Sequence, residues 1–531
     1  MPDKKIVFLL TSAQEYIKHT GDDEKKYAAQ MNIVFEAISE TYIPLIKMFE
    51  NLESDNIPFK VALVLSPVLC TLLDDSVVQD QYIKWLDNRI ELGKKELERC
   101  ATSTKYIEAV RFCFEKAQSD KEDFLRYDQK ILKKIREYHK KGYIELLATC
   151  GTNVYLPHYS DIVEILNAQV EAGLYSHKYF FGEAPDGFWL PELGYAAGFE
   201  KVLHSYGLNY TVLDTRSFLF SEVEPQKGIF GPARFNNSLA VFGRDGDSDN
   251  QIFGEDGYSF NEVYRNNNRD IGFELTLADL EPCVESGCSR YSLGYKYWSS
   301  SEDDVDAPYN FKDAFAQTKK DALAFLQSKN NKLSQAAELL PDSKEVSLIC
   351  SIDLDKLRFN WFEGINWIEN VFRVNNKADF GITFEKSKDL IGNQFALQKI
   401  KPYYGSANGT GYGEDLLSSK NSWLVRYVRK ASQRMVDLAE RFPSDTGLKA
   451  RLLNMGAKEL MIAQSVGWKK MLNSSYFPEY AEQMFTESII DFTAVFDALG
   501  SNTVSTEWLT NLENKHALFP WMNYRIFSRK H

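Results

Sequence analysis

The sequence predicts an α/β fold, built as a parallel barrel or sheet and followed by a separate helical domain. Short apolar runs rich in β-branched and aromatic residues recur along the first two thirds of the chain, as buried parallel strands do. Helical patterns lie between several of these runs, and after residue 421 the strand pattern stops. The chain has 531 residues, too many for one ordinary core, which predicts two or three domains.

Each element follows from its local pattern. The expected strands are 5–12, 59–66, 143–149, 187–190, 208–214, 238–243 and 346–354. Residues 27–52, 161–174 and 311–329 have apolar side chains at helical spacing. We therefore predict a barrel over 1–400, a helical insertion at 68–141 inside it, and a C-terminal helical domain over 401–531.

One long stretch breaks this alternation. Residues 214–310 are rich in Gly, Asn, Asp and Ser and contain many aromatic residues. Long irregular stretches inside compact domains are usually functional. We expect this one to lie over the active face.

The composition excludes several classes of partner. The net charge is -13 and no basic stripe is evident, so we expect no nucleic acid partner. The N-terminal apolar run is too short for a signal peptide and no run reaches 18 apolar residues, so we expect no membrane association and a cytoplasmic location.

The sequence gives little indication of a metal site or of a disulfide framework. The 7 Cys residues are odd in number and scattered, which predicts neither a disulfide framework nor a zinc site. The first strand ends in Thr11 and Ala13 rather than in a His/Asp ligand set. We expect no metal and no cofactor. Aromatic residues make up 14% of the chain, which fits either sugar stacking or a large aromatic core.

Two carboxylates stand at the ends of expected strands. Glu192 lies in "GFWLPELGY" and Asp353 ends "VSLICSID". Reactive side chains of α/β barrels sit at the carboxyl ends of strands, and paired carboxylates are what glycosidic bond cleavage requires. Strand-end acids also bind metals or pair with arginine, so Glu192 could instead pair with Arg216 or Arg244 and hold the barrel together.

The segments "FWLPELGY" and "SIDLDKLRFNWFEG" resemble those of glycoside hydrolase family 57, most closely its 1,4-α-glucan branching enzyme subgroup. The resemblance continues through "LGYKYW", "NSWLVRYVRKASQRM", "KELMIAQSVGW" and "FPWMNYRIF" and so spans nearly the whole chain. It implies that Glu192 is the nucleophile and Asp353 the general acid/base. It also implies a (β/α)7 barrel with a helical insertion and a C-terminal all-helical domain.

The sequence departs from the family in its sugar-contacting motifs. Thr11 and Ala13 replace a His-x-His-like pair, and the third strand leads to Asn153 instead of His. The family's "HWW" segment has become 359–361, "FNW", with Asn360 at its centre. The "SWG" motif survives only as "GSANGTGYG" without its Trp, and the Asp of "SDW" is Gly467.

The resemblance predicts a retaining enzyme that acts on α-glucan through a covalent glycosyl-enzyme, most directly a 1,4-α-glucan branching enzyme. The partner would be an α-glucan or another oligo- or polysaccharide; the sequence predicts nothing about oligomeric state. The expected sugar-binding residues are Asn153, Tyr155, Tyr195, Trp298, Trp361, Tyr404 and Trp468. Two alternatives stay open: a catalytically silent carbohydrate-binding or regulatory protein that keeps the barrel, and an enzyme for a non-starch glycan.

Overall fold

Seven parallel strands form the centre of the molecule. The computed structural model describes residues 2–102, 105–284, 288–501 and 503–530. Each expected strand segment overlaps one of these strands. They are β1 (Asp3–Ser12), β2 (Val61–Leu65), β3 (Ile144–Thr149), β4 (Gly187–Trp189), β5 (Tyr210–Leu213), β7 (Ala240–Gly243) and β8 (Glu345–Asp353).

The strands close into a barrel. Their order is β7-β5-β4-β3-β2-β1-β8, and all neighbours in it are parallel. Arg244, just after β7, forms a parallel bridge with Ile349 of β8, and the Asp245 N–H donates to the Ile349 carbonyl at 2.8 Å. This contact joins the two ends of the order and confirms the (β/α)7 barrel. Two short strands lie beside it: β6 (Ala233–Arg234), antiparallel to β7, and β9 (Ile382–Phe384), next to β1.

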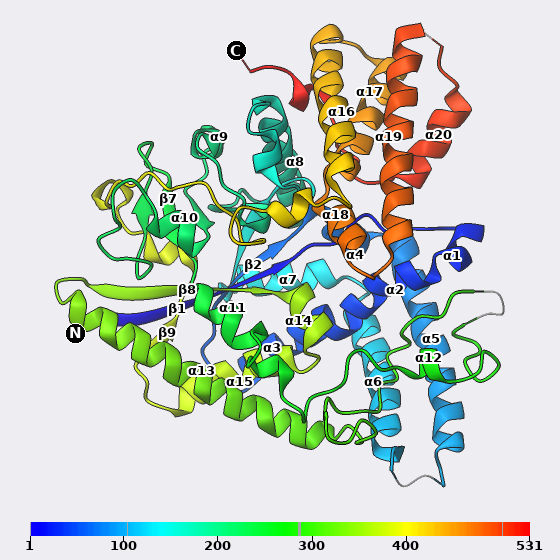
Figure 1. Ribbon diagram of the computed structural model, residues 1–531, viewed down its shortest axis with the longest axis vertical. Helices are drawn as coiled ribbons and strands as arrows, with labels where there is room; N and C mark the ends of the chain where they lie inside the picture. The colour runs from blue at the N-terminus through cyan, green and yellow to red at the C-terminus, as the bar shows by residue number, and fades with distance from the viewer. Residues whose placement is uncertain (1, 103–104, 285–287, 502, 531) are drawn as a thin grey trace.

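The strands are apolar because both of their faces are covered. All five residues of β2 are buried. Outside β1 and β8 lie α13 (Phe311–Leu339) and α15 (Gly364–Lys377), whose Phe325 and Trp367 pack on Phe8 with ring centroids 5.9 and 6.2 Å away (Figure 1). A parallel sheet covered in this way needs near-continuous hydrophobic strands. Much of the high aromatic content therefore belongs to the core.

A helical insertion separates β2 from β3. It consists of α4 (Pro67–Asp74), α5 (Ser76–Arg99), α6 (Ile107–Arg126) and α7 (Ile131–Lys140), of which α5 and α6 project away from the barrel (Figure 1). Tyr295 is buried against α5 and donates a hydrogen bond from its hydroxyl to the Arg89 carbonyl at 2.6 Å.

The irregular stretch 214–310 is therefore divided between two places. Ile271, Leu293 and Tyr295 belong to a hydrophobic cluster shared with the insertion helices, which places this part away from the barrel mouth. An earlier part, α11 (Gly246–Phe253), reaches the mouth through Asp249. The expectation that this stretch lies over the active face therefore holds only in part: Arg244 and Asp249 line the cavity, whereas Ile271, Leu293 and Tyr295 pack against α5 and α6.

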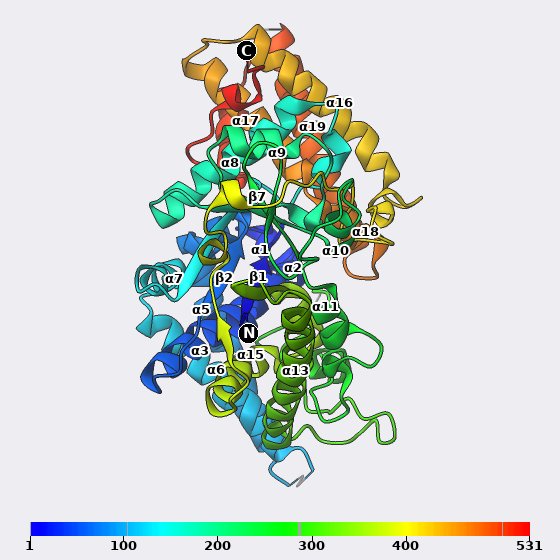
Figure 2. The ribbon, with the colours of Figure 1, turned by 90° about the vertical axis from the view of Figure 1, so that its left-hand side faces the viewer.

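Helices of the described C-terminal residues form a bundle above the barrel, at the end where the strands terminate (Figures 1 and 2). They are α16 (Ser422–Arg441), α17 (Gly447–Gln464), α18 (Val466–Asn473), α19 (Pro478–Ser501) and α20 (Thr506–Lys515). The short α18 lies lowest, and its first N–H, on Val466, donates to the Asn153 carbonyl after β3 at 2.8 Å. This bond fixes the start of α18 to the barrel mouth.

The remaining helices connect the strands. They are α1 (Asp22–Lys26), α2 (Ala28–Ala37), α3 (Ile43–Ser54), α8 (Val163–Phe181), α9 (Phe199–Ser205), α10 (Thr215–Leu219), α12 (Ile271–Glu274) and α14 (Leu354–Asn360). A π-helical turn at Ile38–Tyr42 joins α2 to α3. Within the described residues, no helix has both the length and the apolar character needed to cross a membrane.

Candidate active site

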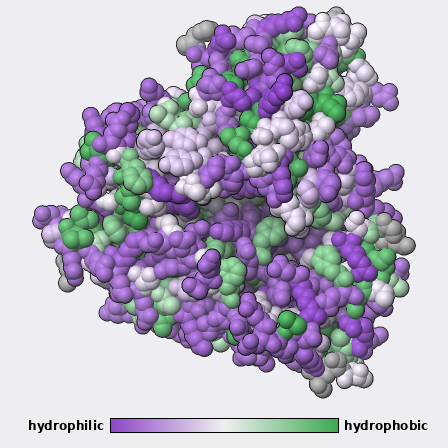
Figure 3. Space-filling view, in the orientation of Figure 1, coloured by the Kyte–Doolittle hydropathy of each residue, from purple (hydrophilic) through white to green (hydrophobic). Residues whose placement is uncertain are grey.

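A cavity of about 520 Å³ opens at the carboxyl ends of the strands. Residues after β1, β3, β4 and β8 line it, together with residues of the segment 405–413 and of α18. The space-filling view shows a hollow near the centre of this face, below the helical bundle (Figure 3). Its volume is typical of small-molecule sites, and its place at the strand ends is where barrel enzymes hold their reactive groups.

Glu192 sits on a strained turn at the edge of this cavity. β4 ends at Trp189, and Glu192 follows in a short 3-10 turn. Its backbone has φ 59° and ψ 14°, a left-handed conformation that residues other than glycine rarely adopt. Such strain costs about 1–3 kcal/mol and gathers at active sites. The Ala407 N–H and the Ser406 hydroxyl donate to the Glu192 carbonyl at 2.8 and 3.1 Å, which holds the turn in place.

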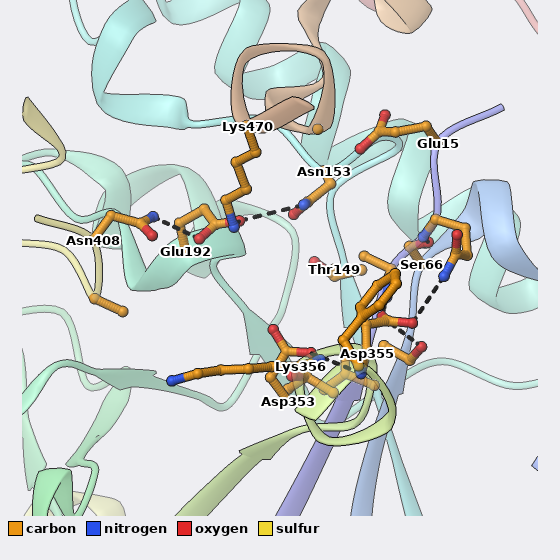
Figure 4. Close-up of a pocket in the computed structure, with 18 of the residues that line it drawn as sticks. Glu15, Ser66, Thr149, Asn153, Glu192, Asp353, Asp355, Lys356, Asn408 and Lys470 are labelled. Carbon is orange, nitrogen blue, oxygen red and sulfur yellow. Dashed lines mark hydrogen bonds and ion pairs between the residues drawn. The ribbon is translucent and has the colours of Figure 1, made fainter. Parts of the chain in front are cut away.

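Three side chains from separate segments converge on the Glu192 carboxylate (Figure 4). Lys470 Nζ donates to Oε1 at 2.6 Å, Asn408 Nδ2 to Oε2 at 2.5 Å, and Asn153 Nδ2 to Oε1 at 3.4 Å. Burial raises the pKa of Glu192, but the Lys470 charge and these hydrogen bonds outweigh it and leave the pKa below its usual value. Glu192 is therefore ionised at neutral pH.

The arginines that the sequence offered as partners for Glu192 are occupied elsewhere. Arg216 Nε and an Arg244 guanidinium nitrogen lie 3.0 and 2.9 Å from the carboxylate of Asp214. The hypothesis that either arginine holds Glu192 as a structural ion pair is wrong. Its cationic partner is Lys470, a residue of the helical bundle.

Asp353 is the last residue of β8 and caps α14. Its Oδ1 accepts hydrogen bonds from the backbone N–H groups of Asp355 and Lys356 at 2.9 and 3.0 Å. The Asp353 side chain is exposed to the cavity, and the other residues of the cavity lining surround it. Burial and the neighbouring Asp355 carboxylate raise the pKa of Asp353 to about 6. Asp353 can thus carry a proton in mildly acidic solution.

Asp355 joins the ends of two adjacent strands. Its Oδ2 accepts from the Ser12 hydroxyl at 2.9 Å and the Ala13 N–H at 2.8 Å, and its Oδ1 accepts from Gln14 Nε2 at 2.8 Å. It therefore fixes the segment after β1 and places a like charge beside Asp353. This segment contains one position of the lost His-x-His-like pair, now filled by Ala13.

Three of these groups, Asp355, Asn408 and Lys470, were not predicted from the sequence. Only the repeated acid in "SIDLD" pointed toward Asp355, and only the altered "GSANG" segment toward Asn408. Lys470 carried no signal at all. Asn408 and Lys470 are 216 and 278 residues from Glu192 along the chain, so tertiary folding alone brings them to it.

The predicted sugar-binding residues fall into separate groups. Asn153 lines the cavity and contacts Glu192. Tyr404 lies outside the cavity lining among the described residues and is 37% exposed. Its ring is nearly parallel to that of Tyr412, with 6.2 Å between the ring centroids. Tyr404 and Tyr412 stand on either side of Asn408 in the sequence, and the Tyr155 hydroxyl lies 3.1 Å from the Tyr404 hydroxyl.

Five further predicted residues are packed in the interior and, within the described chain, do not line this cavity. They are Tyr155, Tyr195, Trp298, Trp361 and Trp468. Their polar atoms serve internal contacts in several cases: the Trp468 indole donates to the Ile462 carbonyl at 2.8 Å, and the Tyr195 hydroxyl donates to Glu200 at 3.1 Å. The structure thus brings together Glu192, Asp353 and Asn153 and leaves these aromatic rings in the core.

Comparison with known proteins agrees with this architecture. Residues 7–276, just over half of the chain, match the family model "Glycosyl hydrolase family 57", and residues 427–527 match "1,4-alpha-glucan branching enzyme, C-terminal". The chain is 23% identical over 514 residues to the 1,4-alpha-glucan branching enzyme TK1436 of Thermococcus kodakarensis. That alignment covers 90% of this chain and 71% of the relative.

Solved structures share the whole fold. The alpha-amylase AmyC of Thermotoga maritima superposes with a TM-score of 0.91 at 26% identity, covering 100% of both chains. The branching enzyme of Pyrococcus horikoshii superposes with a TM-score of 0.88 at 21% identity, covering 100% of this chain and 98% of that one. A match over half of the sequence, the shared barrel and the cavity at its mouth lead to one conclusion: the chain belongs to glycosyl hydrolase family 57 and is an enzyme of the glycoside-hydrolysing or glycosyl-transferring kind.

Proposed function

We propose that this protein is a retaining enzyme for α-glucans, of the 1,4-α-glucan branching type, that works through a covalent glycosyl-enzyme. Glu192 is the nucleophile and Asp353 the general acid/base in this proposal. The observation that carries it is the opposite perturbation of two carboxyl groups in one cavity. The pKa of Glu192 is lowered and that of Asp353 is raised to about 6, which is the division of labour that glycosidic cleavage needs.

The first step would transfer a glucan chain to the enzyme. A Glu192 carboxylate oxygen attacks the anomeric carbon, the bond from that carbon to the leaving oxygen breaks, and Asp353 gives its proton to that oxygen. The three donors around Glu192 hold the carboxylate in one orientation, which favours attack by reducing the reorganisation required. As the new ester forms, the negative charge on Glu192 disappears and the Lys470 contact weakens.

The second step would release the chain to an acceptor. Asp353, now ionised, removes a proton from the acceptor hydroxyl, whose oxygen attacks the anomeric carbon and frees Glu192. A sugar 6-hydroxyl as acceptor gives branching, and water gives hydrolysis. The match of 427–527 to the branching enzyme C-terminal model supports transfer, whereas the likeness to a protein described as an alpha-amylase supports hydrolysis as the second candidate.

The test is incubation of the purified protein with amylose and with maltoheptaose. Chain lengths are followed by chromatography and new α-1,6 linkages by NMR. We expect α-1,6-linked products from amylose, and their loss in Glu192→Gln, an uncharged variant of nearly the same shape. A glycosylated peptide containing Glu192, trapped by acid quenching and found by mass spectrometry, would support the covalent step.

Other outcomes separate the alternatives. Shortened linear chains without new linkages would replace branching by hydrolysis. Products that persist in Glu192→Gln would exclude Glu192 as nucleophile. If the protein binds these sugars but forms no product from either of them, the result would favour the catalytically silent carbohydrate-binding protein.

A further inference from the structure

Another carboxylate of the cavity, Glu15, has no part in the proposed reaction. It follows β1 and reaches toward the start of α18 (Figure 4). Its side chain is almost buried, with Glu15 7% exposed, yet it lines the cavity together with Glu192, Asn153 and Lys470. Among the described residues it forms no ion pair.

Glu15 fits against a residue that has no side chain. A Cβ atom on Gly467 would lie 1.8 Å from Glu15 Oε1, and its next two neighbours, at 2.3 and 2.5 Å, are also atoms of Glu15. The carboxylate of Glu15 therefore occupies the space where a side chain of α18 would begin. Gly467 lies inside a helix and its φ is not in the left-handed region, so backbone conformation does not require glycine there. A side chain at position 467 would instead meet the Glu15 carboxylate and would have to displace it.

The groups around Glu15 do not compensate for the burial of its carboxylate. The Ser465 hydroxyl and the Gly467 N–H approach it from α18, Lys470 acts from a distance on the same helix, and Glu192 faces it across the cavity with a like charge. Burial dominates these effects and raises the pKa of Glu15 to about 7. A carboxyl group with a raised pKa makes the folded protein less stable at neutral pH than an uncharged residue would. Burial, a cavity position and a perturbed pKa together mark a candidate functional group.

We propose that Glu15 is a sugar-binding carboxylate of this site, which accepts a hydrogen bond from a hydroxyl of the glucose unit bound beside Glu192. Gly467 is needed in this proposal because any larger residue would displace that carboxylate. The inference rests on the proposed action on α-glucans and adds a specificity-determining pair to it. Sugar hydroxyls are donors of the kind that a buried carboxylate with free acceptor capacity binds well.

The alternative role, a structural cap for α18, makes different predictions. A cap contributes to stability and leaves sugar affinity unchanged. A sugar-binding carboxylate lowers activity and affinity when it is neutralised, while the protein keeps or gains stability. Glu15→Gln separates the two, because the amide keeps the shape and loses the charge.

The experiment compares five variants on maltoheptaose. Glu15→Gln and Glu15→Ala remove the carboxylate, Gly467→Asp inserts one beside Glu15, and the double variant Glu15→Ala with Gly467→Asp moves it to α18. Glu145→Gln is the control: Glu145 is also buried, has a pKa raised to about 7 and accepts from the Tyr210 hydroxyl at 2.8 Å, but it lies outside the described cavity lining. Thermal unfolding of every variant is measured in parallel.

We expect kcat/KM to fall roughly 10- to 100-fold in Glu15→Gln, the usual effect of losing a hydrogen bond to a charged group, and to stay within about 2-fold in Glu145→Gln. The double variant should regain at least about 10-fold over Glu15→Ala, because Asp is the smallest residue that returns a carboxylate to this volume. Gly467→Asp alone should lose activity. An unchanged kcat/KM in folded Glu15→Gln, or a double variant no better than Glu15→Ala, would overturn the proposal.

Equilibrium binding of maltoheptaose separates failure of this inference from failure of the proposed function. A wild-type protein that binds the sugar without turning it over would refute the enzymatic proposal, and weaker binding by Glu15→Gln would still support the role of Glu15. A wild-type protein that neither binds nor converts maltoheptaose would remove both proposals. Equal binding by wild type and Glu15→Gln would remove the role of Glu15 alone.

Discussion

Burial and the charge on Asp355 together raise the pKa of Asp353 and so set the pH range in which it can act as an acid. Asp355→Asn removes that charge and keeps an oxygen that can still accept from Ser12 and the Ala13 N–H. Since a like charge is one cause of the raised pKa of Asp353, its removal lowers this pKa. The basic limb of the kcat/KM profile, which reports the loss of the proton from Asp353, should move to lower pH.

The size of the effect follows from the pKa of about 6. With this pKa, about 90% of Asp353 is protonated at pH 5 and about 10% at pH 7, so the wild-type kcat/KM should fall roughly tenfold between them. Each unit by which Asp355→Asn lowers the pKa cuts the protonated fraction at pH 7 by about another tenfold. Activity at pH 5 should change less, because the group is still largely protonated there.

The assay is initial-rate conversion of maltoheptaose from pH 4 to pH 9, with protein integrity checked at each pH. Asp249→Asn is the matched control, since Asp249 also lines the cavity but pairs with Lys356 at 3.2 Å. Its basic limb should stay in place. A basic limb that does not move in Asp355→Asn, or that moves to higher pH, would refute the assignment of Asp353 as the acid whose pKa Asp355 raises.

Three further predictions concern α18 and the residues it faces. Lys470→Met should move the acid limb of the kcat/KM profile to higher pH, because the pKa of Glu192 rises when its cationic partner is removed. Lys356→Met, which removes another lysine of the cavity, should leave the acid limb in place. Equal shifts in the two variants would contradict the role of Lys470. Gly467→Ala should lower the free energy of unfolding by about 1–3 kcal/mol through its overlap with Glu15, and an unchanged melting temperature would show that the cavity relaxes freely. Glu15→Gln should raise stability at pH 8 by at most about 3 kcal/mol and add little at pH 4. The wild-type residue has a folded pKa raised to about 7, so its stabilising contribution is complete below about pH 4.5 and lost as pH rises toward 7. A gain independent of pH in thermal unfolding would count against this reading.

The sequence by itself determined the strands of the barrel and the positions of its two principal acids. A parallel strand covered on both faces must be apolar throughout, so 59–66 and 346–354 could be recognised from local composition. Glu192 and Asp353 could be placed at the mouth for the same reason, because each follows such a run directly. The helical character of the chain after residue 421 was also a local property of its spacing.

Tertiary structure decided what surrounds those acids. Neither Lys470 nor Asn408 has a sequence pattern that points to Glu192, because an ion pair between distant segments leaves no periodicity in either one. The same holds for the contact between Glu15 and Gly467, which are 452 positions apart in the chain: only the fold shows that a Cβ atom on Gly467 would lie 1.8 Å from Glu15 Oε1. For the aromatic residues, the sequence suggested a role that the structure does not support. Trp361 and Trp468 are residue types that can stack on sugars, but their packing shows that both are buried in the core. Local composition fixes which segments become strands, whereas protonation states and pocket shape arise from contacts that form only after the chain has closed.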